Sequence, residues 1–487
     1  MSLTSAIRTA QSALSNNSTQ TSVISRNISN ANNPDYNRRS ANLASTSFGA
    51  TVVTTERSQN QALFRQGLQG TSAASGQQTL LTGLERLKSI FGGNDYESSP
   101  AYLMSAFRDT LSTFAVKPSE ATLAETAVAD ANQLAAGLRN ASQEVQATRL
   151  DADRQIALDV EKLNGLLADF KKANDAVVGG TRSGRDISQD LDERDRILKK
   201  IVEIVPVSTN ARESNDLALY TAGGLTLFET SPRTVTFTST AAYGAGVTGN
   251  SVFIDGQPLE PGQGAATTGQ GSLQAHLQVR DQYAPQLQSQ LDEIARGLIM
   301  AFAETDQSAT PTLPDQPGLF TWAGGTMLTS GTLEPGLASS IMVNPAVVTA
   351  SGGDPMLLRD GGINGAAYVA NPAGNASFSD RLDSYVQSFD ADMAFDGAAG
   401  LGTSASLSGF AADSLGWLEQ NRSDAALASE TKDAYVYRTM EADSNLTGVS
   451  IDEELSILLE LEQSYKASAR IISAVDEMLQ ALLAAAR

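Results

Sequence analysis

The sequence predicts an elongated α+β protein of several nested domains, with a terminal α-helical coiled coil and a long-helix rod. An amphipathic helical pattern occupies each end of the chain, longer helical patterns lie between them, and a short β-patterned stretch interrupts these. A terminal helix that cannot bury its apolar side alone packs on its opposite end or on neighbouring copies. A chain of 487 residues is also long for a single core, so about three domains are expected.

The composition excludes several function classes. The formal net charge is −21, and Lys and Arg do not cluster, which argues against nucleic acid or a membrane surface as partner. The chain has no cysteine and a single histidine, His276, so thiolate sites, His-based metal sites and His-driven triads are not expected. We expect no cofactor and no metal. No signal-peptide pattern or apolar run of membrane-spanning length is present, so export would proceed without a cleaved signal.

The first helix is predicted over residues 3–28. Its apolar stripe, with alternating spacings of four and three, is Leu3, Ile7, Ala10, Leu14, Asn17, Thr21, Ile24 and Ile28. Asn17 and Thr21 weaken this stripe and favour one register over others. Pro34 ends the helical region, because proline restricts the residue before it.

The next segments are predicted as β over 41–57 and as helix over 59–91, 101–116 and 120–178. The run 120–178 is the longest helical pattern and makes a rod, since each residue adds about 1.5 Å. A turn at Gly179-Gly180 is expected to separate it from a helix over 186–205.

Pro206 marks a change to alternating β patterns, which predict an inserted small β domain. Helical spacing returns over 272–303 with a kink at Pro285, whereas 305–375 is expected to be mostly loop. The remaining helices are predicted over 381–389, 407–443 and 451–487, the last of these starting at a Ser450/Glu453 capping box.

These elements predict nested, discontinuous domains. The terminal coiled coil comprises 1–40 with 445–487 and is expected to be disordered in the monomer. The rod domain, helical with β elements, comprises 41–205 with 270–444, and the inserted β domain comprises 206–269.

One motif carries a family resemblance. The stretch from Asn27 to Tyr36 (NISNANNPDY) resembles the N-terminal signature of bacterial flagellar rod, hook and hook-associated proteins, which together form the flagellar axis. The motif positions are Asn27, Ile28, Asn30, Asn32, Pro34 and Tyr36. The family usually has Gly after the proline, where this chain has Asp35, and a Pro-Asp pair suits a type I turn better than type II. Residues 190–195, 271–296 and 452–483 resemble the hook-associated members in particular.

The resemblance implies a non-enzymatic structural subunit of the flagellum. Such a subunit is exported unfolded by the flagellar type III system with an export chaperone, and lies outside the cell at the hook–filament junction. Its partners would be copies of itself, the hook protein and a second hook-associated protein. The expected assembly interface is formed by Leu3, Ile7, Ala10, Leu14, Ile24 and Ile28 with Leu455, Leu458, Tyr465, Ile472, Leu479 and Leu482.

Other interpretations of the sequence stay open at this point. The chain could be a hook or distal rod subunit, although these relatives are mostly β outside their termini. A carboxylate-based hydrolase would use acids such as Asp354, Asp360 and Asp380, whose spacing does not demand chemistry.

Three short features are interpreted as structural. The GxGxxG match at 244–249 lacks the strand before it and the helix after it that a dinucleotide site needs, so a β-turn is favoured. The acidic run 190–195 is expected to form intrahelical ion pairs of Arg196 with Asp192 and Glu193. His276 is expected to be a packed structural histidine.

Overall fold

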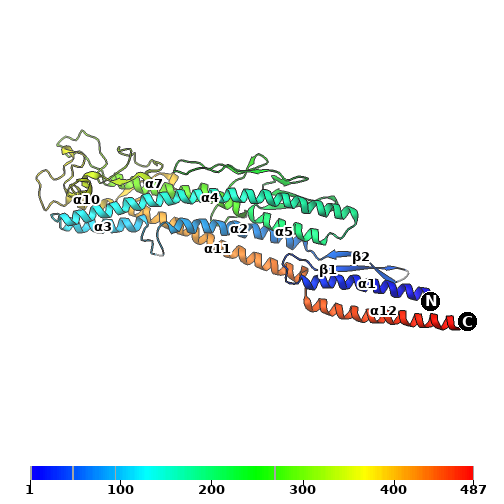
Figure 1. Ribbon diagram of the computed structural model, residues 1–487. Helices are drawn as coiled ribbons and strands as arrows, with labels where there is room; N and C mark the ends of the chain where they lie inside the picture. The colour runs from blue at the N-terminus through cyan, green and yellow to red at the C-terminus, as the bar shows by residue number, and fades with distance from the viewer. Residues whose placement is uncertain (1–2, 47–48, 94, 268–269, 486–487) are drawn as a thin grey trace.

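The molecule is an elongated bundle of long helices with both chain termini at one end (Figure 1). The computed structural model describes residues 3–46, 49–93, 95–267 and 270–485. The rod consists mainly of α2, α3, α4, α5, α7 and α11, whereas α1 and α12 project beyond it as a pair. Loops and short elements gather at the opposite end, around α10. None of the helices in the described part of the chain is long and apolar enough to cross a membrane.

The predicted helices are confirmed with small changes at their ends. Side-chain caps define several starts: Asn60 accepts from two backbone N–H groups of α2, Ser99 caps α3, and Ser406 caps α11. The long helices are α1 (Leu3–Ser29), α2 (Gln61–Ser89), α3 (Pro100–Val116), α4 (Ala121–Ser183), α5 (Ser188–Ile204), α7 (Ala284–Ala301), α11 (Leu407–Thr447) and α12 (Ile451–Ala485). The shorter ones are α6 (Gly271–Gln278), α8 (Leu337–Ser340), α9 (Leu357–Asp360) and α10 (Asp380–Ser388).

The predicted turn at Gly179-Gly180 is wrong, because α4 continues through both glycines to Ser183. A glycine inside a helix costs only about 1 kcal/mol relative to alanine, which tertiary contacts can offset. Gly180 is needed for close packing, since a Cβ there would lie 2.5 Å from the Ile187 side chain. The helix ends at Gly184, whose φ of 69° is the left-handed C-cap conformation that glycine adopts without strain.

The helical stretch predicted over 272–303 is interrupted before its proline. One turn of π-helix, Val279–Tyr283, separates α6 from α7, and Pro285 lies in the first turn of α7. A proline ring clashes with the carbonyl four residues earlier and provides no N–H, so the irregular turn lies just N-terminal to Pro285.

Strands occur in small separate sheets. The hairpin β1 (Arg39–Thr46) and β2 (Gly49–Arg57) is antiparallel, with a register shift between Asn42 and Leu43. The β-patterned insert forms two three-stranded antiparallel sheets, in the orders β3-β4-β5 and β6-β7-β8. Their strands are β3 (Val207–Ala211), β4 (Leu217–Thr221), β5 (Thr226–Phe228), β6 (Val235–Thr236), β7 (Phe253–Ile254) and β8 (Gln257–Pro258). The distal loops add β9 (Phe320–Thr321) with β10 (Met342–Val343), and β11 (Asp392–Ala394) with β12 (Ser404–Ser406).

Two hydrophobic cores run along the rod. One lies between α3, α7, α11 and the first half of α4, and contains a cluster of aromatic rings with Phe107 and Phe302 5.4 Å apart. The other joins the second half of α4 to α5 and to the insert sheets, with Phe170 and Phe228 edge to face at 5.1 Å. The sheets predicted as an inserted domain therefore share a core with the rod helices. The segment 305–375 is mostly irregular, and Phe320 of this segment lies in the first core.

The hairpin lies next to α1 rather than in the rod, although the sequence prediction grouped 41–57 with the rod (Figure 1). The backbone N–H of Val52 donates to Asn16 Oδ1 of α1 over 3.0 Å. A two-stranded hairpin is at best marginally stable alone, so α1 supplies the surface on which it packs. The terminal unit of the fold thus consists of α1, the hairpin and α12.

Candidate assembly interface at the chain termini

α1 and α12 form an antiparallel pair. Asn17 of α1 contacts Ser464, and Asn27 contacts Glu454. Residues later in α1 therefore meet residues earlier in α12. In the amide orientation that gives both polar atoms of Asn17 a partner, the nitrogen donates to Ala13 O. The oxygen accepts from Ser464 Oγ at 3.1 Å and from the Tyr465 N–H at 3.0 Å. A buried amide with partners on the facing helix favours a single register of the pair.

The contact follows a seven-residue repeat on both helices. The buried residues of α12 are Glu454, Leu461, Ser468 and Val475. Those of α1 are Ala10, Asn16, Asn17, Val23, Ile24 and Asn27, in which Ala10, Asn17 and Ile24 are each seven positions apart. This period is that of a coiled-coil seam.

The predicted interface residues of α1 lie in or beside this seam, whereas most of those of α12 do not. On α1, Ala10 and Ile24 are buried and the other four, Leu3, Ile7, Leu14 and Ile28, are half-buried. On α12, Leu458 and Ile472 are half-buried at the edge of the seam, whereas Leu455, Tyr465, Leu479 and Leu482 are exposed. The structure brings the first group together within one chain and leaves the second uncovered.

The seam residues Leu461 and Val475 were missed by the sequence prediction. The prediction followed apolar side chains that lie on other stripes of α12. The buried stripe also contains Glu454 and Ser468, which weaken its apolar signal. The spacing does not single out this stripe, because the predicted residues Leu458, Tyr465, Ile472 and Leu479 also repeat every seven positions.

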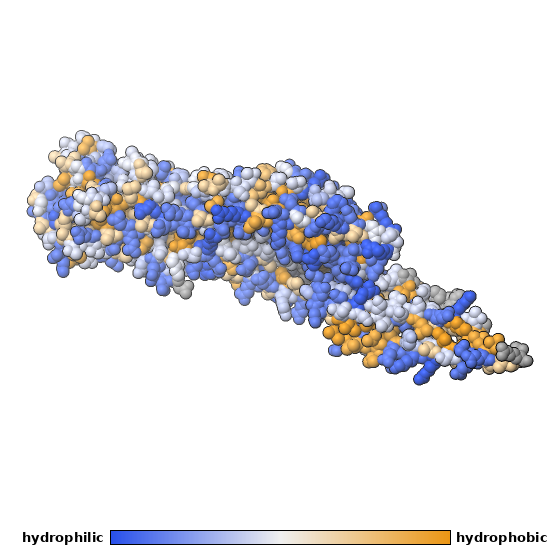
Figure 2. All heavy atoms as spheres, viewed as in Figure 1, coloured by the Kyte–Doolittle hydropathy of each residue, from blue (hydrophilic) through white to orange (hydrophobic). Residues whose placement is uncertain are grey.

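α12 exposes further apolar side chains along its length. Leu459 is 60% exposed and Leu482 56%, and Figure 2 shows hydrophobic residues gathered on the terminal helices, while the visible face of the rod is mostly hydrophilic. Contiguous apolar surface of this kind marks a protein interaction site.

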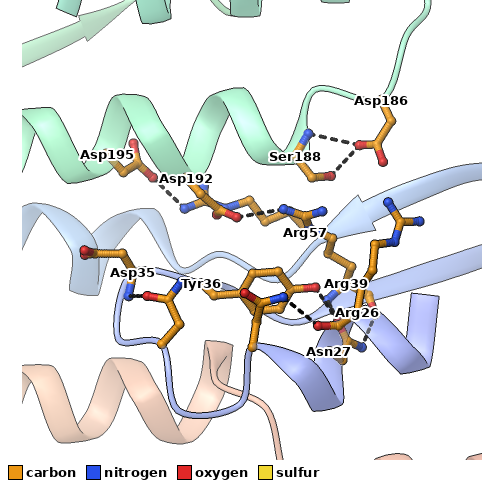
Figure 3. Close-up of polar contacts among 12 residues, drawn as sticks. Arg26, Asn27, Asp35, Tyr36, Arg39, Arg57, Asp186, Ser188, Asp192 and Asp195 are labelled. Carbon is orange, nitrogen blue, oxygen red and sulfur yellow. Dashed lines mark hydrogen bonds and ion pairs between the residues drawn. The ribbon is translucent and has the colours of Figure 1, made fainter. Parts of the chain in front are cut away.

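The motif that begins at Asn27 is organised around that residue, which is 1% exposed (Figure 3). Its amide nitrogen donates to Arg39 O (2.9 Å) and to Glu454 Oε2 (3.0 Å). Its amide oxygen accepts from the Tyr36 hydroxyl (2.8 Å) and the Arg39 N–H (3.1 Å). Burial raises the pKa of Tyr36, so its hydroxyl stays a donor. Asn27 thereby joins the end of α1 to the hairpin and to α12.

Other motif residues shape the connection from α1 to the hairpin. The Asn30 amide donates to Arg26 O over 2.9 Å and closes the end of α1. The Tyr36 N–H donates to Asn33 O (3.1 Å) across Pro34 and Asp35. Asp35 does not have the positive φ that a type II turn requires at that position, as predicted for a Pro-Asp pair. Ile28 is half-buried, and Asn32 is exposed.

A cluster of buried ion pairs holds the hairpin against α5. Arg39 and Arg57 are opposite each other in the strand register, where two like charges would repel. Asp192 accepts from Arg39 Nη2 (2.9 Å) and from Arg57 Nε (2.6 Å), and Asp195 accepts from Arg57 Nη2 (2.7 Å) (Figure 3). Burial raises the pKa of Asp192, although both arginines oppose this shift. Removing one member of a buried pair typically costs about 3–5 kcal/mol, because it leaves a charge uncompensated.

The predicted ion pairs of the acidic run are half correct. Glu193 pairs with Arg196 within α5 (2.6 Å), as expected from their spacing. Asp192 does not pair with Arg196, because it points toward the hairpin and pairs with Arg39 and Arg57. A helical spacing predicts neighbours on one helix, whereas these partners lie 153 and 135 residues away in sequence.

Arg38, which lies between α1 and the hairpin, attaches the start of α12 to this region. Its guanidinium donates to Glu454 Oε1 (2.7 Å) and lies 3.1 Å from Glu453 Oε1. Glu454 is 1% exposed and so depends on Arg38 and Asn27 for its partners. The Glu453 N–H donates to Ser450 Oγ over 3.4 Å, which is one half of the predicted capping box.

The sequence features that suggested other functions have structural contacts. The segment 244–249 contains a turn in which the Val247 N–H donates to Gly244 O, and Arg149 donates to the carbonyls of both residues. Asp360 pairs with Arg359, and Asp354 accepts from the Met356 N–H. His276 is half-buried on α6, and burial lowers its pKa. Within the described residues, no three His, Cys, Asp or Glu side chains are grouped to hold a metal ion.

Comparisons with known proteins agree with this geometry. Residues 84–318 match the model of the flagellar hook-associated protein FlgK helical domain. Residues 445–485 match that of the flagellar basal body rod FlgEFG protein C-terminal, and residues 7–36 that of the flagella basal body rod protein. No match was found among curated protein sequences.

The fold is also similar to a solved structure, that of the flagellar hook junction protein FlgK from Burkholderia pseudomallei. The TM-score is 0.57 at 13% sequence identity, covering 78% of this chain and 99% of that one. Rod-family signatures at both ends of a helical rod define an axial structural protein of the bacterial flagellum. Within this class, the match of residues 84–318 to the FlgK helical domain and the similar fold support a hook-associated protein of the FlgK type.

Proposed function

We propose that this chain assembles at the distal end of the hook and forms the adaptor layer between hook and filament. The observation that carries the proposal is the apolar surface of α12 that its own chain leaves uncovered, with Leu455, Tyr465 and Leu482 exposed. Copies arranged around the flagellar axis would cover this surface with their own terminal helices. The interface would therefore comprise the uncovered side chains as well as the seam.

The partners follow from this location. The chain would contact copies of itself, the hook protein on one side and a second hook-associated protein on the other, outside the cell. It would be exported unfolded through the flagellar type III system with a chaperone. A cysteine-free sequence suits passage in the unfolded state. We assign it a structural role and no enzymatic activity.

Each predicted domain would have its own role in the proposed assembly. The terminal coiled coil predicted over 1–40 and 445–487, together with the hairpin that packs on α1, would order fully on assembly, because a helix pair with one uncovered face is marginal alone. The helices of 41–205 and 270–444 would form the rod layer. The sheets within 206–269 would face outward along it.

The nearest alternative is a hook or distal rod subunit. The 63-residue helix α4 and the match to the FlgK helical domain favour the hook-associated assignment. The alternative makes a different structural prediction, because a hook subunit would extend the hook rather than close it.

Electron microscopy of purified hooks with and without the added protein tests the proposal. We expect a thin layer at the distal end of the hook and no extension of its length. A variant that lacks residues 1–30 should stay folded in its rod but leave the hooks bare. Binding by this truncated variant would contradict the interface assignment, and polymerisation into long hooks would favour the alternative.

A second measurement addresses the monomer. Amide exchange of the isolated chain should show low protection in α1 and α12 and high protection in α4. Strong protection of both terminal helices in the monomer would mean that they pack stably within one subunit.

A further inference from the structure

An exposed apolar strip crosses the junction between the rod and the terminal unit. This junction strip consists of Met440 and Leu446 at the end of α11 and Ile451, Leu455 and Leu459 at the start of α12. Each of these side chains is at least 44% exposed, with Leu446 at 62%. Figure 2 shows the hydrophobic residues that gather where α12 begins.

The strip borders a cavity of about 570 Å³. Met440 and Leu446 line it together with apolar side chains from the start of α2, Leu63, Phe64 and Leu68. Its lining also includes charged side chains, among them Arg38, Lys199, Asp443 and Glu453. A cavity lined by both apolar and polar side chains suits an inserted protein side chain.

The seam with α1 does not use the strip. On α12, Ile451, Leu455 and Leu459 follow each other at intervals of four and so share one face of the helix. The residues that α1 buries on the same turns are Glu454 and Leu461. The strip therefore remains available after the two terminal helices have paired.

The charge of the chain indicates what covers it. Residues 1–57 contain five arginines and two carboxylates, a net charge of +3, in a chain whose total is −21. Residues 440–487, which carry the strip, contain nine carboxylates and three basic residues, a net charge of −6. Arg38, Arg39 and Arg57 pair with carboxylates of their own chain, whereas Arg26 is exposed, so the basic end of α1 is complementary in charge to the acidic surface around the strip.

The N-terminal segment also offers a matching apolar group. Leu43 of β1 is 50% exposed and lies at the register shift of the hairpin, on a two-stranded sheet without further strands in the described chain. Arg26 is exposed at the end of α1. One copy therefore presents both an apolar, acidic strip and an apolar, basic segment.

We propose that the junction strip of one copy receives the N-terminal segment of a second copy, with Leu43 of the hairpin against Leu446 and its neighbours. The proposal rests on the proposed self-assembly and names the surfaces that meet. Because the two surfaces differ, the contact is head-to-tail and continues from copy to copy around an axis. It would couple the terminal unit to the rod, since the strip spans both.

Cross-linking of the full-length chain tests this contact. Leu446→Cys introduces the sole thiol in a cysteine-free sequence, to which a benzophenone maleimide is attached. The labelled protein is mixed with an isotope-labelled, cysteine-free chain and irradiated, both on hooks and in concentrated solution. We expect adducts between copies that map to residues 1–57 of the partner copy.

Leu427→Cys is the matched control, because Leu427 is 67% exposed on the same helix and lies outside the strip. It should give few such adducts. Adducts from position 446 that map only to its own chain, to the rod of a second copy or to the hook protein would overturn the proposal. So would equal yields from positions 427 and 446.

Substitutions provide a second readout. Leu446→Gln and Leu43→Gln should each weaken self-association about tenfold, as expected for the loss of one buried leucine contact, whereas Leu427→Gln should not. Unchanged association of both strip variants would overturn the proposal. If the wild-type chain binds hooks but adducts to residues 1–57 are absent, only this contact is wrong. If adducts form in solution but hooks stay bare, the hook location is wrong instead.

Discussion

Asn27 Nδ2 donates a hydrogen bond to Glu454 Oε2 over 3.0 Å, which joins two residues separated by 427 positions in sequence. Both side chains are 1% exposed, and each has further hydrogen bonds to residues 36–39, between α1 and the hairpin. The bond closes the chain at the point where both terminal helices leave the rod. The helix pair is thus supported at its base by one amide and one carboxylate.

Replacing Asn27 tests this link. Asn27→Ala removes the bonds to Glu454, Tyr36 and the Arg39 backbone, and leaves a buried carboxylate with Arg38 as its remaining partner. We expect the docking of α12 to weaken by about 2–4 kcal/mol. Amide exchange of residues 451–461 in the hook-bound protein measures this loss. Asn32→Ala, an exposed asparagine in the same motif, is the control, and equal protection in both variants would contradict the role of Asn27.

Two glycines near the end of α4 should respond in opposite directions. Gly179 lies inside the helix, and nothing lies within 4 Å of the position that an alanine Cβ would take, so Gly179→Ala should stabilise the rod by about 0.5–1 kcal/mol. Gly184 has a φ of +69°, so Gly184→Ala should destabilise it by about 1 kcal/mol. Urea denaturation of the two variants measures the difference. The same sign for both would contradict the assignment of the C-cap to Gly184.

The error at Gly179-Gly180 shows what a single sequence can provide. Apolar spacing predicted the helices well, because each long helix buries one continuous stripe, and α1 begins and ends within one residue of its prediction. A glycine pair, however, has two meanings, a turn or a close helix contact. The choice depends on Ile187, which packs against Gly180 only once α5 has folded back.

The candidate interface was predictable to a different extent on the two helices. α1 has one apolar stripe, and its predicted residues are all buried or half-buried. α12 has apolar side chains on several stripes, so its sequence could not identify the stripe that α1 covers. The covered stripe contains Glu454, whose partners Asn27 and Arg38 lie more than 400 positions away.

Replacing Asp35, the residue after the motif proline, should change the stability only modestly. Asp35 Oδ1 lies 3.0 Å from Lys199 Nζ, with side chains 34% and 36% exposed, and such partly exposed pairs contribute about 1 kcal/mol at most. Asp35→Gly restores the usual family residue and should lower stability by less than about 1.5 kcal/mol, including the backbone entropy of glycine. Denaturation by urea measures this change. Lys199→Met isolates the ion pair, and a larger loss in this variant would contradict the surface role.

Asp292 should give the rod a pH dependence. Burial raises the pKa of Asp292 to about 6, although it accepts from the backbone N–H groups of Gly336 and Ala338. The folded state therefore binds a proton at a pH where the unfolded chain does not. The cost of the buried charge, about 3 kcal/mol at neutral pH, should disappear as the pH falls from 7 to 4.

Carboxyl-carbon NMR titration of Asp292 measures its midpoint, and urea denaturation at several pH values measures the linked stability. Relative to Asp292→Asn, the wild type should gain stability as the pH falls. Asp396 provides a control of opposite sign, because the N–H groups of Ala398 and Leu333 lower its pKa. The contribution of Asp396 should be lost on acidification. A midpoint for Asp292 near the ordinary value would contradict the expected dependence.

The last prediction concerns the register of the terminal helices. Ala10, Asn17 and Ile24 repeat every seven residues along α1, so a slip of one heptad would still place an apolar residue on the seam. Asn17 distinguishes the native register, because its amide is bonded to Ser464 and to the Tyr465 N–H. Asn17→Leu should therefore strengthen α1–α12 packing while it allows slipped pairings.

A photo-reactive label on Gln463→Cys reports the register directly, since residue 463 is exposed beside Ser464. With Asn17 present, adducts on α1 should centre on residue 17. With Asn17→Leu, they should spread toward residues 10 and 24, and binding to hooks should fall because misaligned pairs present the wrong surface. Thr21→Leu, a half-buried neighbour that keeps Asn17, should leave the adducts centred. An unchanged adduct pattern in Asn17→Leu would show that the register is set by other contacts, such as Asn27 with Glu454.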